Sequence, residues 1–282
     1  MRRSTRVPGR LAPWLAGIAL GLVLAGLIGG VRPAAAAECL LVTDAQTRTV
    51  VAQSGACMAR HSPFSTFKIA ISLMAFDAGL LESAALPVLE TEPGLADWNA
   101  AWRGPQTPQS WMTHSVAWFS QVLTRRLGPE RFAAYVKDFR YGNENVGGVK
   151  GAEDGLISAW LGSSLVISPR EQVDFLRRML GGDLPVSRQA VDQTRALLKA
   201  QETPLGWSLF GKTGAGYARR PDGTLDKSRP MGWFVGWVEK DGRTLIFARF
   251  TALDIPSAEP LGQVARRQLL AALAPVLSAQ AR

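Results

Sequence analysis

Strand-like segments occur at both ends of this chain, and helix-like segments lie between them. Residues 39–52 have branched apolar side chains on either side of a polar turn. The later runs 207–210, 231–239 and 243–251 are rich in aromatic and branched side chains, and a strong hairpin turn at 241–242 joins the last two. The first strands can pair with the later ones only if the helical segment between them brings the chain back to the same sheet. The order therefore predicts an α+β fold, an antiparallel β-sheet flanked by helices with an inserted all-helical lobe.

Residues that begin and end helices bound the segments in between. Ser168-Pro169-Arg170-Glu171 is a capping box with proline at the first helical position. Proline, glycine and polar residues over 90–110 predict irregular structure. We expect the helical lobe to cover about residues 80–200, and the first hairpin and the last helix to join the later strands. The expected helices are 65–77 (ended by Gly79), 115–127, 129–139, 168–179, 187–200 and 260–279.

Residues 1–37 have the pattern of an export signal. Arg2 to Arg10 form a basic segment, residues 11–31 are charge-free and apolar, and four alanines at 34–37 offer a cleavage site before Glu38. An uncleaved transmembrane anchor is the alternative, because 21 apolar residues are long enough to span a membrane. Cleavage would leave residues 38–282 as a single domain in the periplasm, with no membrane attachment.

Composition and charge argue against a disordered chain and against a nucleic-acid-binding protein. With 47% hydrophobic and 20% charged residues, the chain resembles a folded protein rather than a disordered one. The formal charge of +9 suggests nucleic acid as a partner, but five arginines and no acid lie in the first 37 residues. Subtracting those five charges leaves only +4 on the remainder, where the arginine pairs are scattered. We therefore expect no nucleic-acid partner.

The chain has two cysteines, Cys39 and Cys57. In an oxidising compartment they can form one disulfide, and two buried free thiols are the alternative. Together with the two histidines, His61 and His114, they do not have the spacing of a zinc site, so we expect no metal.

One motif match has the wrong structural context. The segment 206–213, Gly-Trp-Ser-Leu-Phe-Gly-Lys-Thr, fits the nucleotide P-loop expression. A P-loop is a cradle of backbone N–H groups between a strand and a helix, whereas Trp-Ser-Leu-Phe is strand material and no helix follows it. We therefore do not expect nucleotide binding.

Ser65 and Lys68 stand at the start of an apolar segment that follows Pro63. Residues three apart share a helical face, so the lysine amine is expected one turn beneath the serine hydroxyl. A serine nucleophile needs a base nearby, and a desolvated lysine or a derivative of it can serve. A solvated lysine at a plain helix start is the alternative, but the almost wholly apolar run 69–76 disfavours it.

Three further motifs follow in order: Ser115-Val116 where a helix is expected to open, Tyr141-Gly142-Asn143 in a loop, and Lys212-Thr213-Gly214 at an expected strand end. With Ser65–Lys68, Trp160 and Trp233–Trp237, they make the chain resemble the class D β-lactamases, the oxacillinases, within the penicillin-recognising serine enzymes. The similarity covers nearly all of residues 39–275. It implies the fold shared by serine β-lactamases and penicillin-binding transpeptidases.

The resemblance implies a nucleophile and a base. Ser65 would be acylated by a penicillin and then released by water. Lys68 would react with CO₂ to give an N-carboxylated lysine, the general base; burial favours the neutral amine that this reaction needs. The indole of Trp160, which is only a donor, would hold that anionic group, and Val116 would keep the pocket dry. No other cofactor is implied.

The resemblance also implies a proton relay and an oxyanion hole. Ser115, with Lys212 beside it, would pass a proton toward the leaving nitrogen. The backbone N–H groups of Ser65 and Ala215 would stabilise the oxyanion, which is usually the largest electrostatic effect in acyl transfer.

Thr213, Gly214 and Arg266 would bind the substrate carboxylate, for which arginine offers a bidentate grip. Arg267 is adjacent and remains an alternative to Arg266.

Some residues shape the site or depart from the family pattern. Tyr141 and Asn143 would shape the site rather than do chemistry. Phe64 precedes the nucleophile where a smaller residue is common, Ala70 replaces a frequent proline, and His114 precedes the second serine. None removes a catalytic group, so these departures bear on substrate range.

Two other functions share the main motifs. A D-Ala-D-Ala peptidase and a β-lactam-sensing receptor domain are both acylated but deacylate slowly. Trp160 and the implied carboxylated lysine favour the hydrolase, which would confer antibiotic resistance. The expected partner is a small β-lactam, and the sequence leaves monomer and homodimer open.

Overall fold

The computed structural model describes residues 37–91, 99–198, 201–203, 205–220 and 222–280. Residues 1–36, which carry most of the expected export signal, lie outside the described residues. Within the described ranges, no helix is both long enough and apolar enough to cross a membrane.

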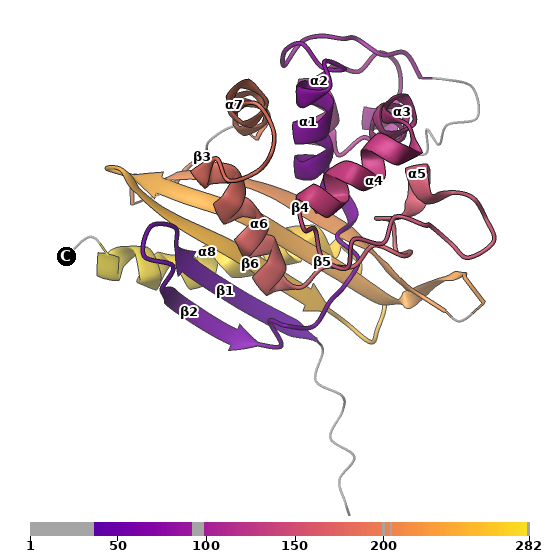
Figure 1. Ribbon diagram of the computed structural model, residues 1–282. Coiled ribbons are helices and arrows are strands. Elements are labelled where there is room, and N and C mark those ends of the chain that lie inside the picture. Colours follow the sequence, from indigo (N-terminus) through magenta and orange to yellow (C-terminus); the bar gives the residue numbers. More distant parts are fainter. Residues whose placement is uncertain (1–36, 92–98, 199–200, 204, 221, 281–282) are drawn as a thin grey trace, which may run out of the picture. The chain divides into compact units, whose positions relative to one another are not determined.

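A six-stranded antiparallel sheet joins the two ends of the domain (Figure 1). Strand β1 pairs with β6 with Cys39 opposite Phe250, so the first hairpin lies beside the later strands as the sequence predicts. Asp241 and Gly242 both have positive φ and form the two-residue turn between β5 and β6. In the order β2-β1-β6-β5-β4-β3, the strands are Val50–Gly55, Glu38–Asp44, Arg243–Ala252, Leu225–Lys240, Ser208–Arg219 and Gln201–Glu202.

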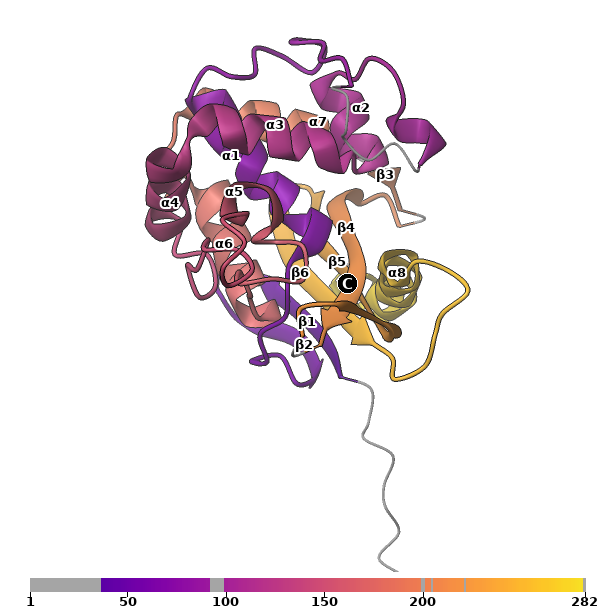
Figure 2. The same ribbon diagram turned by 90° about the vertical axis from the view of Figure 1, so that its right-hand side faces the viewer.

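Helices cover both faces of this sheet. α8 contacts β4, β5 and β6, whereas α6 contacts β1, β5 and β6 from the opposite side (Figure 2). A short 3₁₀ helix, η1, precedes α1 and contacts β4 and β5. The helices are η1 Phe64–Phe67, α1 Lys68–Asp77, η2 Ala100–Trp102, α2 Pro108–His114, α3 Ala117–Leu127, α4 Pro129–Asp138, α5 Gly155–Ser158, α6 Pro169–Gly181, α7 Arg188–Leu197 and α8 Leu261–Gln280. The expected α+β fold is confirmed.

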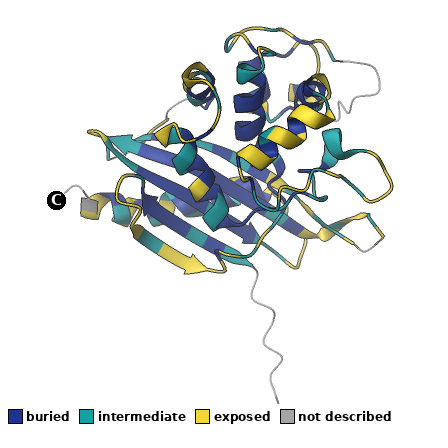
Figure 3. Cartoon of the chain, viewed as in Figure 1, coloured by how far each residue is buried: buried dark blue, intermediate teal, exposed yellow. Residues whose placement is uncertain are grey.

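The two faces of the sheet bury two separate cores. Along β5, Trp233, Val235 and Trp237 belong to the core beneath α1 and α6, while Phe234 and Val238 belong to the core beneath α8. Alternate strand residues point to opposite faces, so a strand covered on both sides reads as a continuous apolar run. Figure 3 shows α1 and the central strands as the buried part of this arrangement.

Three sequence-based expectations were wrong in detail. Lys212–Gly214 lie within β4 rather than at its end, because pairing with β5 keeps the glycine-rich segment extended as far as Arg219. Helix α2 begins inside the segment 90–110 that was expected to be irregular, where Thr107 and Ser110 form a capping box. Residue Ser115 ends α2 instead of opening the next helix.

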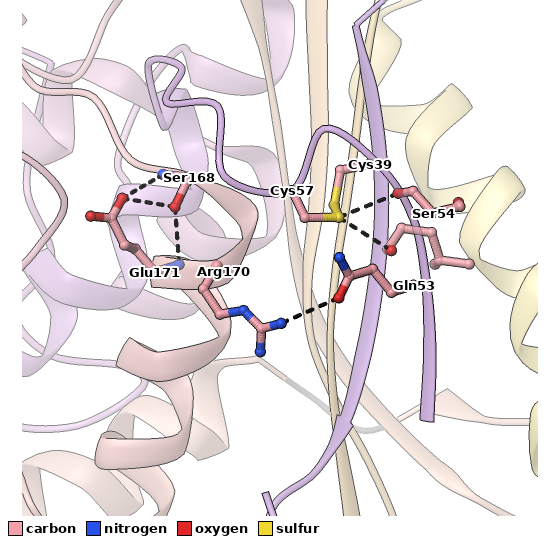
Figure 4. Close-up of a disulfide and its surroundings, with 8 residues drawn as sticks. Cys39, Gln53, Ser54, Cys57, Ser168, Arg170 and Glu171 are labelled. Carbon is pink, nitrogen blue, oxygen red and sulfur yellow. Dashed lines mark hydrogen bonds between the residues drawn. A yellow bond between two sulfur atoms is a disulfide. The ribbon is translucent and has the colours of Figure 1, made fainter. Parts of the chain in front are cut away.

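The cysteines form a disulfide at the edge of the sheet (Figure 4). Cys39 lies in β1 and Cys57 follows β2, and their Cα atoms are 5.1 Å apart. The backbone N–H of Arg170, in the capped first turn of α6, donates to the carbonyl oxygen of Cys57. The disulfide therefore ties the residue that follows β2 back to β1, next to the start of α6.

Candidate active site

The first serine–lysine pair forms within a single helical turn. Ser65 lies in η1 and Lys68 is the first residue of α1. Residues three apart align along a 3₁₀ helix, and the Nζ atom of Lys68 lies 3.4 Å from the Oγ atom of Ser65. Lys68 is fully buried, and burial, with the nearby charge of Lys212, holds the pKa of its amine well below the usual range. Burial therefore favours the neutral form of the amine that faces the serine hydroxyl.

The second serine–lysine pair forms between distant segments. Ser115 ends α2 in a left-handed conformation with φ of +57°, and the buried Val116 caps α3 directly after it. Lys212 of β4 donates a hydrogen bond to the Oγ atom of Ser115, and a second to the carbonyl oxygen of Thr213 at 3.1 Å. Burial lowers the pKa of Lys212 to about 8. This lysine therefore remains mostly cationic at pH 7.

Both serines open into one cleft of about 620 Å³. Phe64, Ser65, Ser115, Thr213 and Ala215 line it, and a set of apolar side chains forms much of the rest of its wall, with some polar ones between them. The wall includes Trp102, Ala117, Trp118, Leu161, Tyr217, Leu225 and Pro260. The cleft can hold a small molecule that has an apolar body and a few polar groups.

A second cavity of about 390 Å³ shares Thr213 with this cleft and includes Lys212 and Arg266. The guanidinium of Arg266 lies 5.8 Å from the ring centre of Phe234 and donates a hydrogen bond to Gln201. Arg267 instead pairs with Glu259 at 2.7 Å on the exposed side of α8. Of the two adjacent arginines, Arg266 is the one that faces the cleft region.

Trp160 has a buried polar group without a partner. Its ring is fully buried against Phe67 and Phe132, and its Nε1 atom has no hydrogen-bond partner among the described residues. Buried N–H groups are almost always paired, since an unpaired one loses its hydration without compensation. Phe67 is the residue directly before Lys68, so this unused donor lies beside the turn that carries the buried amine.

Tyr141 and Asn143 support the site from outside the cleft. Tyr141 is fully buried, its ring packs against Phe67 at 5.0 Å, and burial raises the pKa of its hydroxyl. The side-chain amide of Asn143 donates to the carbonyl oxygen of Ser164 at 2.8 Å and accepts from the N–H of Val166 at 3.0 Å. These contacts hold the loop segments together.

The sequence analysis missed Gln172 of α6. This buried side chain donates to the Oγ1 atom of Thr66 at 3.0 Å and to the hydroxyl of Tyr141 at 3.2 Å. Thr66 in turn donates to the carbonyl oxygen of Pro63 at 2.7 Å. A polar chain therefore fixes η1 from below. The signal was a glutamine on the same helical face as the apolar residues Phe175 and Leu176, three and four positions later.

The chain was compared with known families and proteins. The description "Penicillin binding protein transpeptidase domain" matches residues 38–260. β-Lactamase OXA-9 of Klebsiella pneumoniae is 43% identical over 244 residues, which cover 85% of this chain and 88% of that protein. β-Lactamase OXA-1 of Escherichia coli is 39% identical over 213 residues, 74% of each chain. The mecR1 methicillin resistance protein of Staphylococcus aureus is 31% identical over 219 residues, which are 33% of its length.

Solved structures show the same relationship. The class D β-lactamase OXA-427 superimposes with a TM-score of 0.80 at 41% identity, over 86% of this chain and 98% of that one. The class D β-lactamase YbXI from Nostoc gives a TM-score of 0.72 at 26% identity, over 86% and 94% of the two chains. The chain therefore belongs to the class D β-lactamases, the oxacillinases, and is a hydrolase.

Proposed function

We propose that the protein hydrolyses the β-lactam amide of penicillins through an acyl-enzyme on Ser65 and so confers antibiotic resistance. The observation that carries the proposal is the buried Lys68 amine, 3.4 Å from the hydroxyl of Ser65, which lines one cleft together with Ser115, the partner of Lys212.

In the first half-reaction the Oγ atom of Ser65 bonds to the β-lactam carbonyl carbon, and the ring C–N bond breaks. The base takes the serine proton, and Ser115 passes a proton to the leaving nitrogen while the charge of Lys212 stabilises this arrangement. The oxyanion lies between the backbone N–H groups of Ser65 and Ala215. Water then hydrolyses the ester and frees Ser65.

Substrate binding involves the second cavity. The carboxylate of a penicillin would be bound by Thr213, Gly214 and Arg266, with Lys212 adding positive charge. The proposal is supported because Arg266 lines the cavity that also contains Lys212 and Thr213, whereas Arg267 is engaged with Glu259.

We propose that the base is N-carboxylated Lys68. The residues fit this group, because burial lowers the pKa of the Lys68 amine and favours its neutral form, and the Nε1 atom of Trp160 is a buried donor without a partner among the described residues. The amine nitrogen bonds to the carbon of CO₂ and releases a proton. The carbamate supplies an oxygen that takes the serine proton and later activates water. Val116 excludes bulk water beside the pocket.

The experiment that tests the proposal is steady-state hydrolysis of a penicillin by the purified protein, with CO₂ removed and then bicarbonate restored. We expect turnover to collapse without CO₂ and to return with bicarbonate. Turnover that does not depend on CO₂ would contradict the carboxylated lysine. Ser65→Ala is the matched control, and it should be inactive in both conditions.

The competing function is a β-lactam receptor, which would share the serine–lysine motifs of this chain. A receptor would give one stoichiometric burst and a stable acyl group on Ser65, with or without bicarbonate. A slow D-Ala-D-Ala peptidase would behave in the same way toward a penicillin. Either result would overturn the hydrolysis of penicillins.

We also propose that the protein is exported to the periplasm. The Cys39–Cys57 disulfide supports this location, because such bonds persist in oxidising compartments. Protein recovered from a periplasmic extract should begin near Glu38. Retention of residues 1–37 in a membrane fraction would instead indicate an anchor.

A further inference from the structure

The residue before the nucleophile has an unusual backbone and side chain. Phe64 has φ of +49°, in the left-handed region that a bulky residue rarely adopts. Its N–H donates to the carbonyl oxygen of Trp160 at 2.9 Å, which holds this conformation. The side chain is only 3% exposed, although it borders the cleft. Strain of this kind persists only where surrounding contacts impose it.

The phenyl ring of Phe64 presses against a glycine of β4. A Cβ atom on Gly216 would lie 2.1 Å from Cε1 and 2.7 Å from Cζ of that ring. Real Cβ atoms do not approach so closely, so the strand reaches the ring only because residue 216 has no side chain. A Cβ atom on Gly162, in the turn after α5, would lie 3.7 Å from Cε1 of the same ring. The ring therefore fills the space between β4 and this turn.

That turn is held by hydrogen bonds. The hydroxyl of Ser62 donates to the carbonyl oxygen of Trp160 and accepts from the N–H of Gly162, both at 2.8 Å. Arg219 of β4 donates to the carbonyl oxygen of Gly162 at 2.7 Å. The ring of Phe64 therefore packs beside a turn that these hydrogen bonds hold in place.

A second contact lies two residues earlier on β4. A Cβ atom on Gly214 would lie 2.8 Å from the carbonyl oxygen of Pro63. Residues two apart on a strand point to the same side, so Gly214 and Gly216 both face the η1 segment. Ala215 lies between these two contacts, and Ser65 lies between Pro63 and Thr66 on the opposing segment.

We infer that Phe64 is a positioning residue whose ring sets the distance between Ser65 and the backbone N–H of Ala215, and with it the width of the oxyanion hole. The inference rests on the acyl-enzyme function proposed above. It assigns a role to the large residue before the nucleophile: its bulk is matched by a glycine at position 216.

The test is a double-substitution cycle of Phe64→Ala and Gly216→Ala, measured as the acylation rate and kcat/KM for a penicillin. In the wild-type background, G216A forces ring and strand apart and should lower the acylation rate about 100-fold. In the F64A background the new methyl group fits, so the same substitution should cost less than about threefold. F64A alone should lower the rate about tenfold, since the strand loses one support.

Two further variants separate positioning from stability. Phe247→Ala removes a buried ring from the core beneath α8, so it should lower the melting temperature and leave kcat/KM unchanged. Phe64→Leu keeps most of the bulk and should retain about a third of the wild-type acylation rate or more. It also keeps the test available if F64A does not fold.

Each outcome decides one question. Equal losses from G216A in both backgrounds, or a wild-type acylation rate in F64A, would overturn the role of Phe64. An F247A loss of activity as large as that of F64A would also overturn it, because stability would then explain both. If the wild-type protein is acylated but does not turn over penicillin, the proposed hydrolysis is wrong. The acylation rates of the four proteins in the double-substitution cycle would still test the role of Phe64.

Discussion

The two serine–lysine pairs of the cleft contain the same groups but form in different ways. Ser65 and Lys68 are three residues apart and meet through one turn of helix. Ser115 and Lys212 are 97 residues apart and meet only because the end of α2 packs beside β4. A local pair is positioned by backbone geometry, whereas a remote pair depends on the packing of whole elements.

The pairs also differ in charge. Lys68 has its pKa held well below the usual range by burial and by the charge of Lys212, whereas burial lowers the pKa of Lys212 only to about 8. Burial therefore favours the neutral form of the Lys68 amine, whereas Lys212 is mostly cationic at pH 7. We propose that this difference divides the work, so that the first pair takes the serine proton and the positive charge of the second pair stabilises the substrate and the proton transfer through Ser115.

Loss of the neutral amine should have the largest effect. Lys68→Ala removes the proposed base, and hydrolysis of a penicillin should fall about 10⁴-fold. The residual rate should not respond to bicarbonate. Lys137→Ala, which removes an exposed lysine of α4, is the control and should match the wild type. If hydrolysis by K68A still responds to bicarbonate, Lys68 is not the group that reacts with CO₂, and the proposed roles of the two pairs are wrong.

Loss of the cationic amine should have a smaller and different effect. Lys212→Met should lower kcat/KM about 100-fold, because the substrate loses electrostatic stabilisation in the cleft. The bicarbonate response should remain, since Lys68 and Trp160 are unchanged. Measuring the rate against bicarbonate concentration in K212M checks this, and a lost response would mean that the two pairs act as one unit.

The indole N–H of Trp160, which has no partner among the described residues, lies near the first pair because its ring packs against Phe67, the residue before Lys68. Trp160→Phe removes the N–H and keeps most of the ring, so the bicarbonate concentration for half-maximal activity should rise about 30-fold. Trp118→Phe is a matched change at a buried tryptophan of the cleft wall whose N–H already donates to a carbonyl oxygen. It should leave the bicarbonate requirement unchanged, and an equal rise in both variants would argue against a specific role for Trp160.

The pH profile should separate the pairs further. Lys212 loses its proton as the pH passes about 8, so kcat/KM should fall about tenfold between pH 7 and pH 9. Stability should change in the opposite direction. The unfolded chain holds this proton up to its ordinary pKa, so between pH 8 and 10.5 the unfolded state binds more protons, and the free energy of unfolding should rise by about 3 kcal/mol.

Chemical denaturation of the wild type and K212M across that pH range measures the difference. The rise in the free energy of unfolding should be smaller in K212M by the contribution of Lys212, about 3 kcal/mol. An equal rise in both proteins would mean that Lys212 is not the group that titrates.

The smallest effect on activity should come from the disulfide, which joins β1 to the residue that follows the outer strand β2 (Figure 4). Replacing Cys39 and Cys57 with alanine should lower the free energy of unfolding by about 3 kcal/mol, since the bond closes a loop between residues 18 apart. Hydrolysis at a temperature where the variant is folded should equal that of the wild type. A loss of activity there would show that the outer hairpin supports one of the pairs.

Short-range patterns predicted the local parts of this protein. The capping box at Ser168–Glu171 begins α6 as expected, and the turn at 241–242 joins β5 to β6. The spacing of Ser65 and Lys68 predicted their contact. The glycines of β4 were read as the end of a strand because isolated glycine disfavours strands, whereas pairing with β5 overrides that preference.

The sequence alone determined which groups are available, their order along the chain, and the one pair that a helical turn brings together. Only the tertiary structure decided that Lys212 meets Ser115, that Arg266 rather than Arg267 faces the cavity, that Gln172 supports η1, and that Phe64 fits against Gly216. These contacts join segments far apart in the chain. Helical and strand periods repeat over a few residues, but the burial that brings distant segments together depends on the packing of the whole domain.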